Sequence, residues 1–247
     1  MKRLVAYDLD GTLAQSKQPI DSATAAMLAR LTRVAVVAII SGGGWPQFEQ
    51  QVVAKLPDDT NLRQLYLLPA SGTKLYRYEG GWKLVYDELF TPDQRTRILG
   101  ALTTTVAGQG LDRAQSWGDR IEDRGSQITF SGLGQQAPLA AKLAWDPDFA
   151  KRKRLQAALV PLLPEFAVRV GGSTSIDITR QGIDKAYGMA KLVTASGIPA
   201  AQMIYIGDAV YPGGNDYTVL EAGIDTIGIR DVAETRRVSD AIVLCLS

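Results

Sequence analysis

The sequence predicts an α/β fold, in which a Rossmann-like parallel-sheet core carries an inserted α+β cap domain. In the first third of the chain, apolar stretches typical of buried strands alternate with helical patterns, as in a doubly wound sheet. The last third returns to this alternation. The middle combines helices with half-polar strand patterns, which is typical of an antiparallel sheet. We therefore place the core at residues 1–86 and 184–247 and the cap at 87–183.

Composition narrows the class of protein. The 247 residues are 46% hydrophobic and 21% charged, with a net charge of +1, which indicates neither a nucleic-acid partner nor a membrane surface. The longest apolar run, residues 34–40, is far shorter than the ~20 residues that cross a bilayer, and we expect a cytoplasmic protein. The one cysteine, Cys245, excludes an internal disulfide. The absence of histidine excludes imidazole-based hydrolysis and histidine metal ligands.

The first predicted elements follow in chain order. Residues 3–9 form an apolar strand, and Asp21 or Ser22 can cap a helix through "ATAAMLARLT". The run "VAVVAII" is a strand buried on both faces, and it ends at the loop "SGGGWP". The next elements are a helix in 47–56, a strand–turn–strand unit in 65–78 and a hairpin turn at "EGGW".

The middle and last thirds complete the prediction. Cap helices are expected in 93–110 and 148–163, and strand alternation in 120–134 and 166–179. The basic run 151–154 is interpreted as a solvated helix face. The core resumes with further elements: a helix at 186–197, strands at 203–208 and 225–230, and a closing helix at 234–246.

Carboxylates follow two of the predicted core strands. Asp8 and Asp10 come at the end of the first strand, and because alternate strand residues face the same side, they can point together. Asp208 and Asp216 follow the strand "MIYIG". Open α/β sheets bind their ligands beyond the carboxyl ends of the strands, and Mg²⁺ prefers oxygen ligands. We therefore expect a Mg²⁺ site there. Taken alone, the first pair could instead be turn formers.

An anion site is expected beside these carboxylates. "SGGG" follows a third buried strand and offers the Ser41 hydroxyl and the backbone N–H of Gly42. Lys185, in "GIDKAYG", can bring a positive charge near it, although a single lysine is more often solvated. An acidic metal site next to an anion site suits phosphoryl transfer, which depends on positioning and charge stabilisation.

These residues together carry a family resemblance. "DLDGTL", Ser41, Lys185 and "GDAVYPGGND" resemble, in order, the four motifs of the haloacid dehalogenase superfamily of phosphotransferases. "GGSTSIDITRQGIDKAYG", "YPGGND" and "ETRRV" are further similar to the eukaryotic-type phosphomannomutases, whose cap is of the same inserted α+β kind. In such enzymes the cap sets substrate specificity.

The resemblance implies roles for the core residues. Asp8 would be the nucleophile that forms an aspartyl-phosphate, and Asp10 the acid and base. Metal ligands would come from Asp8, from Asp10 through its backbone carbonyl, and from Asp208. The loop around Asp208 would be supported by Asn215 and Asp216. Ser41, Gly42 and Lys185 would bind the transferring phosphate.

The resemblance also implies sugar-phosphate contacts. Arg124, Ser175 and Asp177 match cap positions that hold the substrate, and Lys17 lies where the family carries an arginine. Two other cap arginines of the mutases are replaced, by Gln135 and by Lys142. Lysine lacks the bidentate guanidinium fork, so this cap would hold a distal phosphate less firmly than a mutase does. The "SGG" of 41–43 also looks more like the phosphatase members.

These departures favour hydrolysis. We expect a Mg²⁺-dependent phosphohydrolase that acts on a sugar phosphate or another small phosphomonoester. The alternative is a phosphomannomutase-like enzyme that moves phosphate between carbons 1 and 6 of a hexose. A third hypothesis, a catalytically idle sugar-phosphate-binding protein, fits poorly with the intact Asp8–Asp10 pair. The resemblance to mutases that dimerise through their caps makes a homodimer plausible.

Overall fold

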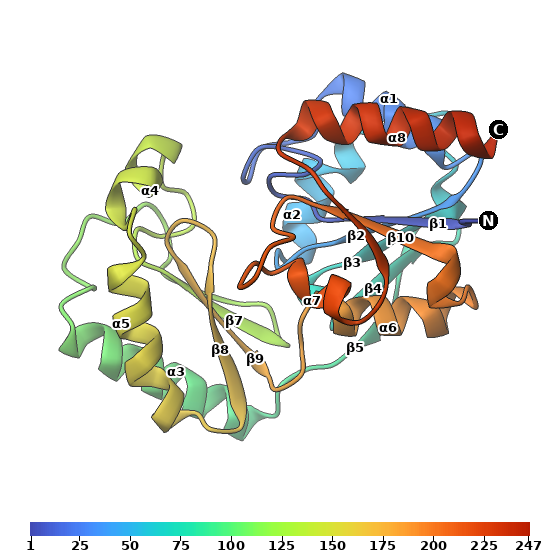
Figure 1. Cartoon of the computed structure of the whole chain (residues 1–247). Helices are drawn as coiled ribbons and strands as arrows, with labels where there is room; N and C mark the ends of the chain where they lie inside the picture. The colour runs from blue at the N-terminus through green and yellow to red at the C-terminus, as the bar shows by residue number, and fades with distance from the viewer. The chain divides into compact units, whose positions relative to one another are not determined.

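The computed structural model describes all residues, 1–247, and its chain divides into two compact units. The first, here called the core, comprises Met1–Asp87 and Ile183–Ser247; the second, the cap, is Glu88–Gly182. Figure 1 labels most of the elements, whose bounds are β1 Leu4–Tyr7, α1 Ser22–Leu31, β2 Val36–Ile40, α2 Trp45–Gln51, β3 Leu65–Leu68, β4 Lys74–Tyr78, β5 Trp82–Asp87, α3 Pro92–Gly108, β6 Ile121–Asp123, β7 Gln127–Ser131, α4 Leu139–Trp145, α5 Ala150–Leu159, β8 Phe166–Gly171, β9 Ser175–Arg180, α6 Lys185–Ser196, β10 Met203–Gly207, α7 Tyr217–Glu221, β11 Asp225–Gly228 and α8 Val232–Leu246.

The core is a seven-stranded sheet in the order β11-β10-β1-β2-β3-β4-β5. The five strands from β11 to β3 are parallel, whereas β4 and β5 add an antiparallel edge. This confirms the predicted α/β class. The strand β1 is the middle one of the five parallel strands, between β10 and β2, so the residues that follow it emerge where the sheet is covered on both faces.

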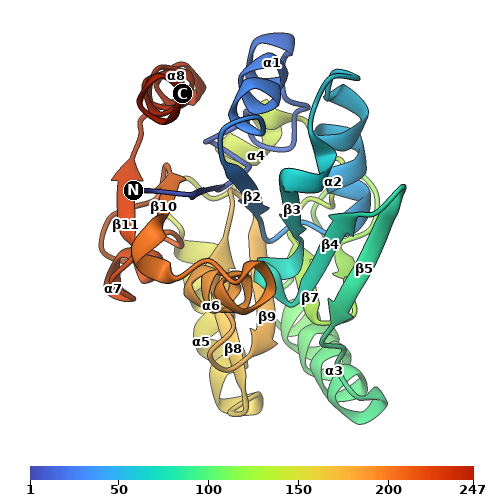
Figure 2. The same ribbon diagram turned by 90° about the vertical axis from the view of Figure 1, so that its right-hand side faces the viewer.

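Helices cover both faces of this sheet, as Figure 2 shows from the side. One face packs Val5 and Tyr7 against α1, α2 and α8, and the other packs Leu4 and Ala6 against α6 and α7. The Tyr7 hydroxyl lies 2.7 Å from Ser239 Oγ, which ties β1 to α8. All four residues of β1 are fully buried, as the uninterrupted apolar run predicts.

Capping fixes where the helices of the core begin. Asp21, one of the two caps that the sequence allows, caps α1 by accepting from Thr24 N at 2.8 Å. Asp184 caps α6 by accepting from Tyr187 N at 2.9 Å, which makes Lys185 the first residue of that helix. The helix approaches the turn at 70–72 closely, because a Cβ added to Gly72 would lie 2.4 Å from Gly188 Cα.

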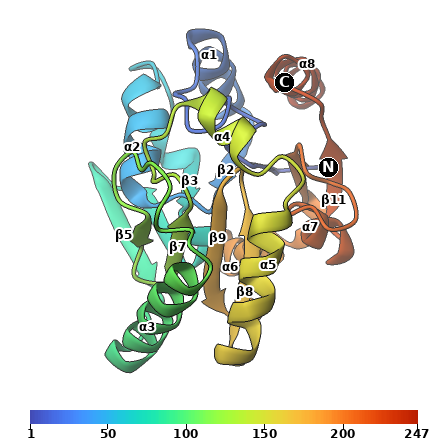
Figure 3. The same ribbon diagram turned by 90° about the vertical axis from the view of Figure 1, so that its left-hand side faces the viewer.

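The cap is a four-stranded antiparallel sheet, β6-β7-β9-β8, with α3 and α5 on one face (Figure 3). Its core packs Ile128 and Phe130 of β7 and Ile176 and Ile178 of β9 against the two helices. Because strand residues alternate, the opposite face of the sheet carries the polar side chains of the same strands. The predicted α+β character of this segment is confirmed.

Three cap and core features differ from the sequence-based expectation. Each alternating stretch of the cap forms a hairpin of two strands, β6–β7 and β8–β9, rather than one strand. The short helices α4 and α7 have too few turns to show a periodic pattern. The expectation of a solvated basic face at 151–154 is wrong for Arg152, which is 2% exposed and bonds Asp146 Oδ2 at 2.8 Å.

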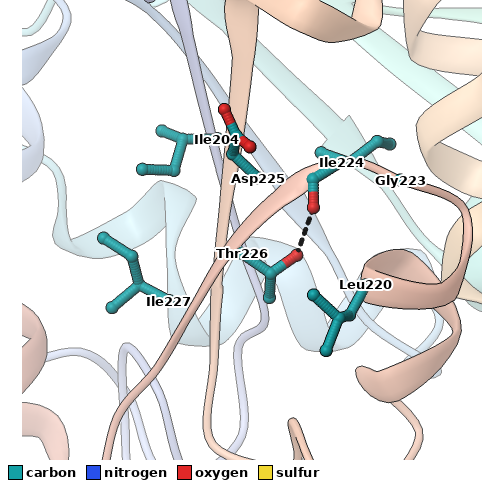
Figure 4. Close-up of a pocket in the computed structure, with 7 residues that line it drawn as sticks. All are labelled: Ile204, Leu220, Gly223, Ile224, Asp225, Thr226 and Ile227. Atoms are coloured by element: carbon teal, nitrogen blue, oxygen red, sulfur yellow. Dashed lines mark hydrogen bonds between the residues drawn. The ribbon is translucent and has the colours of Figure 1, made fainter.

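No helix combines the length and the apolar character that crossing a membrane requires. The surface has a hollow at the edge strand β11, drawn in Figure 4, lined by the apolar side chains Ile204, Ile224 and Ile227 among others. Thr226 Oγ1 donates to the backbone oxygen of Ile224 there, at 2.8 Å. None of the carboxylates that the sequence singles out lines this hollow, so it plays no part in the site described next.

Candidate functional site

The centre of the candidate site is Lys185, whose ammonium group lies between two buried carboxylates. Its Nζ donates to Asp8 Oδ1 at 2.6 Å and to Asp216 Oδ1 at 2.5 Å. The exposed fractions of the three side chains are 3%, 6% and 0%, so all three charges are withdrawn from water. Residues that lie far apart in the chain meet here because β1 and β10 are neighbours and α6 begins beside them.

Asp216 is held from several directions. Besides Lys185, its Oδ1 accepts from the Tyr205 hydroxyl at 2.5 Å, and its Oδ2 accepts from Ala209 N at 2.9 Å. A Cβ on Gly207 would lie 2.4 Å from Oδ2, so only glycine leaves room for this carboxylate. The sequence did not single out Tyr205, which reads as one more apolar residue of strand β10. Asp216 is thereby fixed as the anchor that aims Lys185 at Asp8.

Burial sets the proton affinities of this group. Burial raises the pKa of Asp8 to about 8, against the opposing effect of the nearby Lys185 charge. For Lys185, burial lowers the pKa, but the charges of Asp8 and Asp216 outweigh it and hold the pKa above its usual range. Burial also raises the pKa of Asp208. A second cation beside these carboxylates would stabilise their charged forms.

The residues fit a hard divalent cation. Asp8, Asp208 and Asp216 each offer a carboxylate oxygen, and these oxygens lie within 4.8 Å of one another. Three carboxylates against one lysine leave an excess of negative charge, and an all-oxygen donor set suits Mg²⁺. Asp208 is the exposed member and approaches Thr12 Oγ1 at 3.4 Å. A Cβ on Gly11, where φ is +95°, would lie 2.4 Å from Asp208 Oδ2, so the glycine gives this carboxylate its space.

The loop after β2 is the candidate anion site. Ser41 is 3% exposed, and its Oγ accepts from Gly43 N at 3.2 Å. Its backbone is fixed by Leu68 of the neighbouring strand, whose oxygen accepts from Ser41 N at 3.3 Å. Gly42, between Ser41 and Gly43 in the chain, is partly exposed. Because β2 is adjacent to β1, this loop emerges at the same sheet edge as Asp8.

Asp10 is directed to different partners from those of Asp8. Its Oδ1 accepts from Lys17 N at 2.5 Å, and its Oδ2 accepts from Gln47 Nε2 at 2.9 Å. Its carboxylate is not part of the three-carboxylate cluster. Lys17 therefore lies close to Asp10 through its backbone, in a left-handed conformation with φ of 56°. Gln47 was missed by the sequence analysis, because no motif marks it beyond its place four residues after Gly43.

The loop after β10 brings only some of its polar residues into the site. Asp208 and Asp216 join the cluster, whereas Asn215 is exposed, and its backbone oxygen accepts from Thr218 Oγ1 at 3.4 Å. No hydrogen bond joins the Asn215 side chain to these carboxylates. Its predicted role as a loop support stays a prediction.

The predicted cap residues lie on or beside the polar face of the cap sheet. Ser175 and Asp177 are alternate residues of β9, and Asp177 Oδ1 accepts from Thr129 Oγ1 at 2.7 Å and from Gln127 Nε2 at 3.1 Å. Arg124 follows β6, and its guanidinium bonds Glu122 Oε2 at 2.7 Å. These bonds hold a polar surface in one arrangement, and their substrate role remains a prediction.

The two positions that replace mutase arginines also lie in the cap. Gln135 lies in the loop after β7, where its backbone N donates to Asp119 O at 3.1 Å. Lys142 lies in the last turn of α4. Arg169, which is exposed on β8 and pairs in register with Asp177, is a cap arginine that the sequence analysis did not single out. The sequence feature that could have identified Arg169 is its position in the alternating stretch 166–179.

Comparison with known proteins finds relatives in both sequence and fold. The chain is 24% identical over 227 residues to the phosphomannomutase of Schizosaccharomyces pombe, covering 88% of this chain and 85% of that one. Its fold matches a haloacid dehalogenase-like hydrolase from Bacteroides thetaiotaomicron with a TM-score of 0.65 at 17% identity, over 99% of this chain and all of that one. It also matches the IMP-bound IMP-nucleotidase of Plasmodium falciparum, with a TM-score of 0.72 at 13% identity, over 99% of this chain and 68% of that one.

The fold matches confirm the haloacid dehalogenase-like architecture, and the sequence match goes further. The family model described as eukaryotic phosphomannomutase matches residues 25–243, which is most of the chain. The resemblance read from the motifs is therefore confirmed. The chain is an enzyme of the phosphotransferase and phosphatase kind, and it belongs to the eukaryotic phosphomannomutase family.

Proposed function

We propose that the protein is a Mg²⁺-dependent phosphohydrolase of a sugar phosphate or another small phosphomonoester, and that it works through an aspartyl-phosphate. The observation that carries the proposal is Lys185, held between buried Asp8 and Asp216. A buried ammonium group beside a carboxylate can neutralise the charge of a phosphoryl group that arrives there, without any reorganisation.

The reaction would take place in two steps. In the first, an Asp8 oxygen attacks phosphorus, the bond from phosphorus to the sugar oxygen breaks, and Asp10 gives its proton to that leaving oxygen. In the second, water attacks the phosphorus, Asp10 takes a proton from the water, and the bond to Asp8 breaks to release inorganic phosphate. Ser41, Gly42 and Lys185 would hold the phosphoryl oxygens throughout.

The bound cation would offset charge and orient the phosphate. Asp8, Asp208 and the backbone carbonyl of Asp10 are the proposed ligands for Mg²⁺, which when bound supplies Lewis-acid stabilisation of the phosphoryl oxygens. Support comes from the three-carboxylate cluster and from the space that Gly11 leaves for Asp208. Asp216 contributes by aiming Lys185 rather than by facing the phosphate.

The cap would select the substrate. Arg124, Ser175 and Asp177 are the proposed sugar-phosphate contacts, with Lys17 as a further cation from the core. The choice of water as acceptor rests on Gln135 and Lys142, where an amide and an ammonium group replace the forked guanidinium that grips a distal phosphate.

The second candidate is a mutase reaction between carbons 1 and 6 of a hexose phosphate, which the family match favours. In that case the acceptor in the second step is a sugar hydroxyl, and Asp8 must be primed by a bisphosphorylated sugar. The two candidates share every core residue and differ only in what the second step accepts.

A product assay separates them. The purified protein is incubated with Mg²⁺ and mannose 1-phosphate, with and without glucose 1,6-bisphosphate, while free phosphate and mannose 6-phosphate are followed together. Free phosphate without isomer supports the hydrolase. Mannose 6-phosphate that appears only with the bisphosphate supports the mutase. If neither product forms, and a screen of other phosphate esters with Asp8→Asn as the blank is also negative, the enzymatic proposal is overturned.

A further inference from the structure

The carboxylate of Asp10 is held at both of its oxygens. Lys17 N donates to Oδ1 at 2.5 Å, and Gln47 Nε2 donates to Oδ2 at 2.9 Å. A carboxylate bonded on both sides cannot rotate about its last side-chain torsion without breaking one of these bonds. The orientation of Asp10 therefore depends on two donors that come from different segments of the core.

The two donors are not equivalent. Lys17 contributes a backbone N–H, so no substitution of its side chain removes the bond directly. Gln47 contributes a side-chain amide from the first turn of α2, and its Nε2 also donates to Gln51 Oε1 at 2.9 Å. Both hydrogens of this amide thus point at fixed acceptors, and Gln51 is itself 4% exposed. Gln47 is accordingly held in one orientation and can transmit it.

Gly43 provides the room that Gln47 needs. A Cβ at position 43 would lie 2.2 Å from Gln47 Oε1 and 2.5 Å from its Cδ. The same glycine donates its N–H to Ser41 Oγ in the candidate anion loop. The amide of Gln47 therefore lies packed against that loop on one side and bonded to Asp10 on the other.

We propose that Gln47 is a positioning residue for Asp10, whose amide sets the plane of the acid–base carboxylate. This inference rests on the proposed acid–base function of Asp10. Gln47 itself would touch neither the substrate nor the metal. Without the amide, Asp10 keeps one bond and gains rotational freedom, so the fraction of time it spends aligned with the reacting oxygen falls.

The two steps would respond differently, and this difference distinguishes positioning from general damage. A sugar oxygen needs the proton of Asp10 in order to leave, whereas p-nitrophenolate is a good leaving group that departs without one. The second step needs Asp10 to take a proton from water whatever the first leaving group was. Loss of Gln47 should therefore spare the first step with p-nitrophenyl phosphate and slow the second.

The test is a single-turnover experiment with enzyme in excess over p-nitrophenyl phosphate in the presence of Mg²⁺. Nitrophenolate release reports the first step, and free phosphate in quenched samples reports the second. In Gln47→Leu we expect wild-type nitrophenolate release and phosphate release slowed about tenfold, the scale of a modest misalignment. Gln47→Asn, whose amide is one methylene too short to reach Asp10, should behave in the same way, and it covers the case in which the leucine variant folds poorly.

Gln50→Leu is the matched control, because Gln50 is exposed on the same helix and should leave both steps unchanged. Equal rates in wild type and both Gln47 variants would overturn the inference while leaving the proposed function intact. Equal slowing of both steps would also overturn it, since that is the signature of a distorted site. If the wild type turns over no phosphate ester at all, the proposed function fails, and this inference fails with it.

Discussion

Replacing Lys185 by methionine tests the electrostatic centre of the site. The substitution keeps most of the length of the side chain and removes its charge, which leaves Asp8 and Asp216 buried without their shared cation. Removing one partner of a buried ion pair costs about 3–5 kcal/mol.

The cost of the substitution depends on pH through the Asp8 carboxyl. The pKa of Asp8 is already raised to about 8 by burial with the lysine in place, and loss of the lysine raises it further. A carboxyl whose pKa is raised on folding contributes full stability below its unfolded pKa, about 3.9, and loses it as pH rises toward the folded pKa. Both proteins therefore lose stability in parallel up to about pH 8. Above that pH only the variant keeps losing about 1.4 kcal/mol per pH unit, so its deficit relative to the wild type grows there.

The assay is thermal or urea unfolding of wild type and Lys185→Met from pH 5 to pH 9. A loss of about 3 kcal/mol corresponds to a fall in Tm of roughly 6–12 °C for a chain of this size. Lys2→Met is the control, because Lys2 forms a partly exposed ion pair with Asp225, worth at most ~1 kcal/mol. A Lys185→Met protein as stable as the wild type at pH 8, or one whose deficit does not grow above pH 8, would contradict the assigned burial and charge of this group.

Mg²⁺ binding at pH 7 should release protons, and the affinity for Mg²⁺ should rise toward pH 8, because the cation competes with the proton on Asp8, whose pKa is raised by burial to about 8. Calorimetry in buffers of different ionisation enthalpy measures the proton release. Identical binding heats in all buffers would contradict the prediction. Gly72→Ala should cost more than Gly80→Ala, by about 1–3 kcal/mol in urea unfolding, because both glycines have positive φ but only at Gly72 would a Cβ meet the backbone of α6. Asp146→Asn should lower the free energy of unfolding by about 3 kcal/mol at pH 7 and by much less below about pH 4. Burial alone would raise the pKa of Asp146, but the hydrogen bonds from Arg152 hold it below its usual range, so the stabilisation is present above the unfolded pKa and lost in acid. A loss of stability that does not change with pH would exclude this explanation.

Much of the core could be predicted from the sequence because its signals are local. An apolar run followed by two aspartates predicts a buried strand that delivers carboxylates to a sheet edge, and β1 with Asp8 is placed accordingly. Lys185 lies 177 residues from Asp8 along the chain. Its neighbours in the sequence suggested only a positive charge near the anion site, and the resemblance of the ordered motifs assigned both residues to one site. Once the family is recognised, the parallel pairing of β1 with β10 explains why the residues that follow these two strands meet.

What could not be predicted depends on single side chains that carry no pattern. Gln47 and Tyr205 resemble any polar residue of a short helix and any aromatic residue of a buried strand, and their hydrogen bonds exist only in the folded geometry. Arg152 lies in a basic run whose simplest interpretation is a solvated face. Its burial depends on Asp146, which precedes the helix and accepts a hydrogen bond from the Arg152 guanidinium. Such pairs are decided by packing rather than by propensity.

In the proposed mechanism, Asp8 carries the phosphoryl group during turnover. The most direct measurement is to quench the wild-type enzyme during turnover with Mg²⁺ and a phosphate ester, reduce the acyl phosphate with borohydride, and locate the resulting homoserine by mass spectrometry. We expect homoserine at position 8, and none in Asp8→Asn or without substrate. Turnover with no modified residue at position 8, or with the label on another carboxylate, would contradict it.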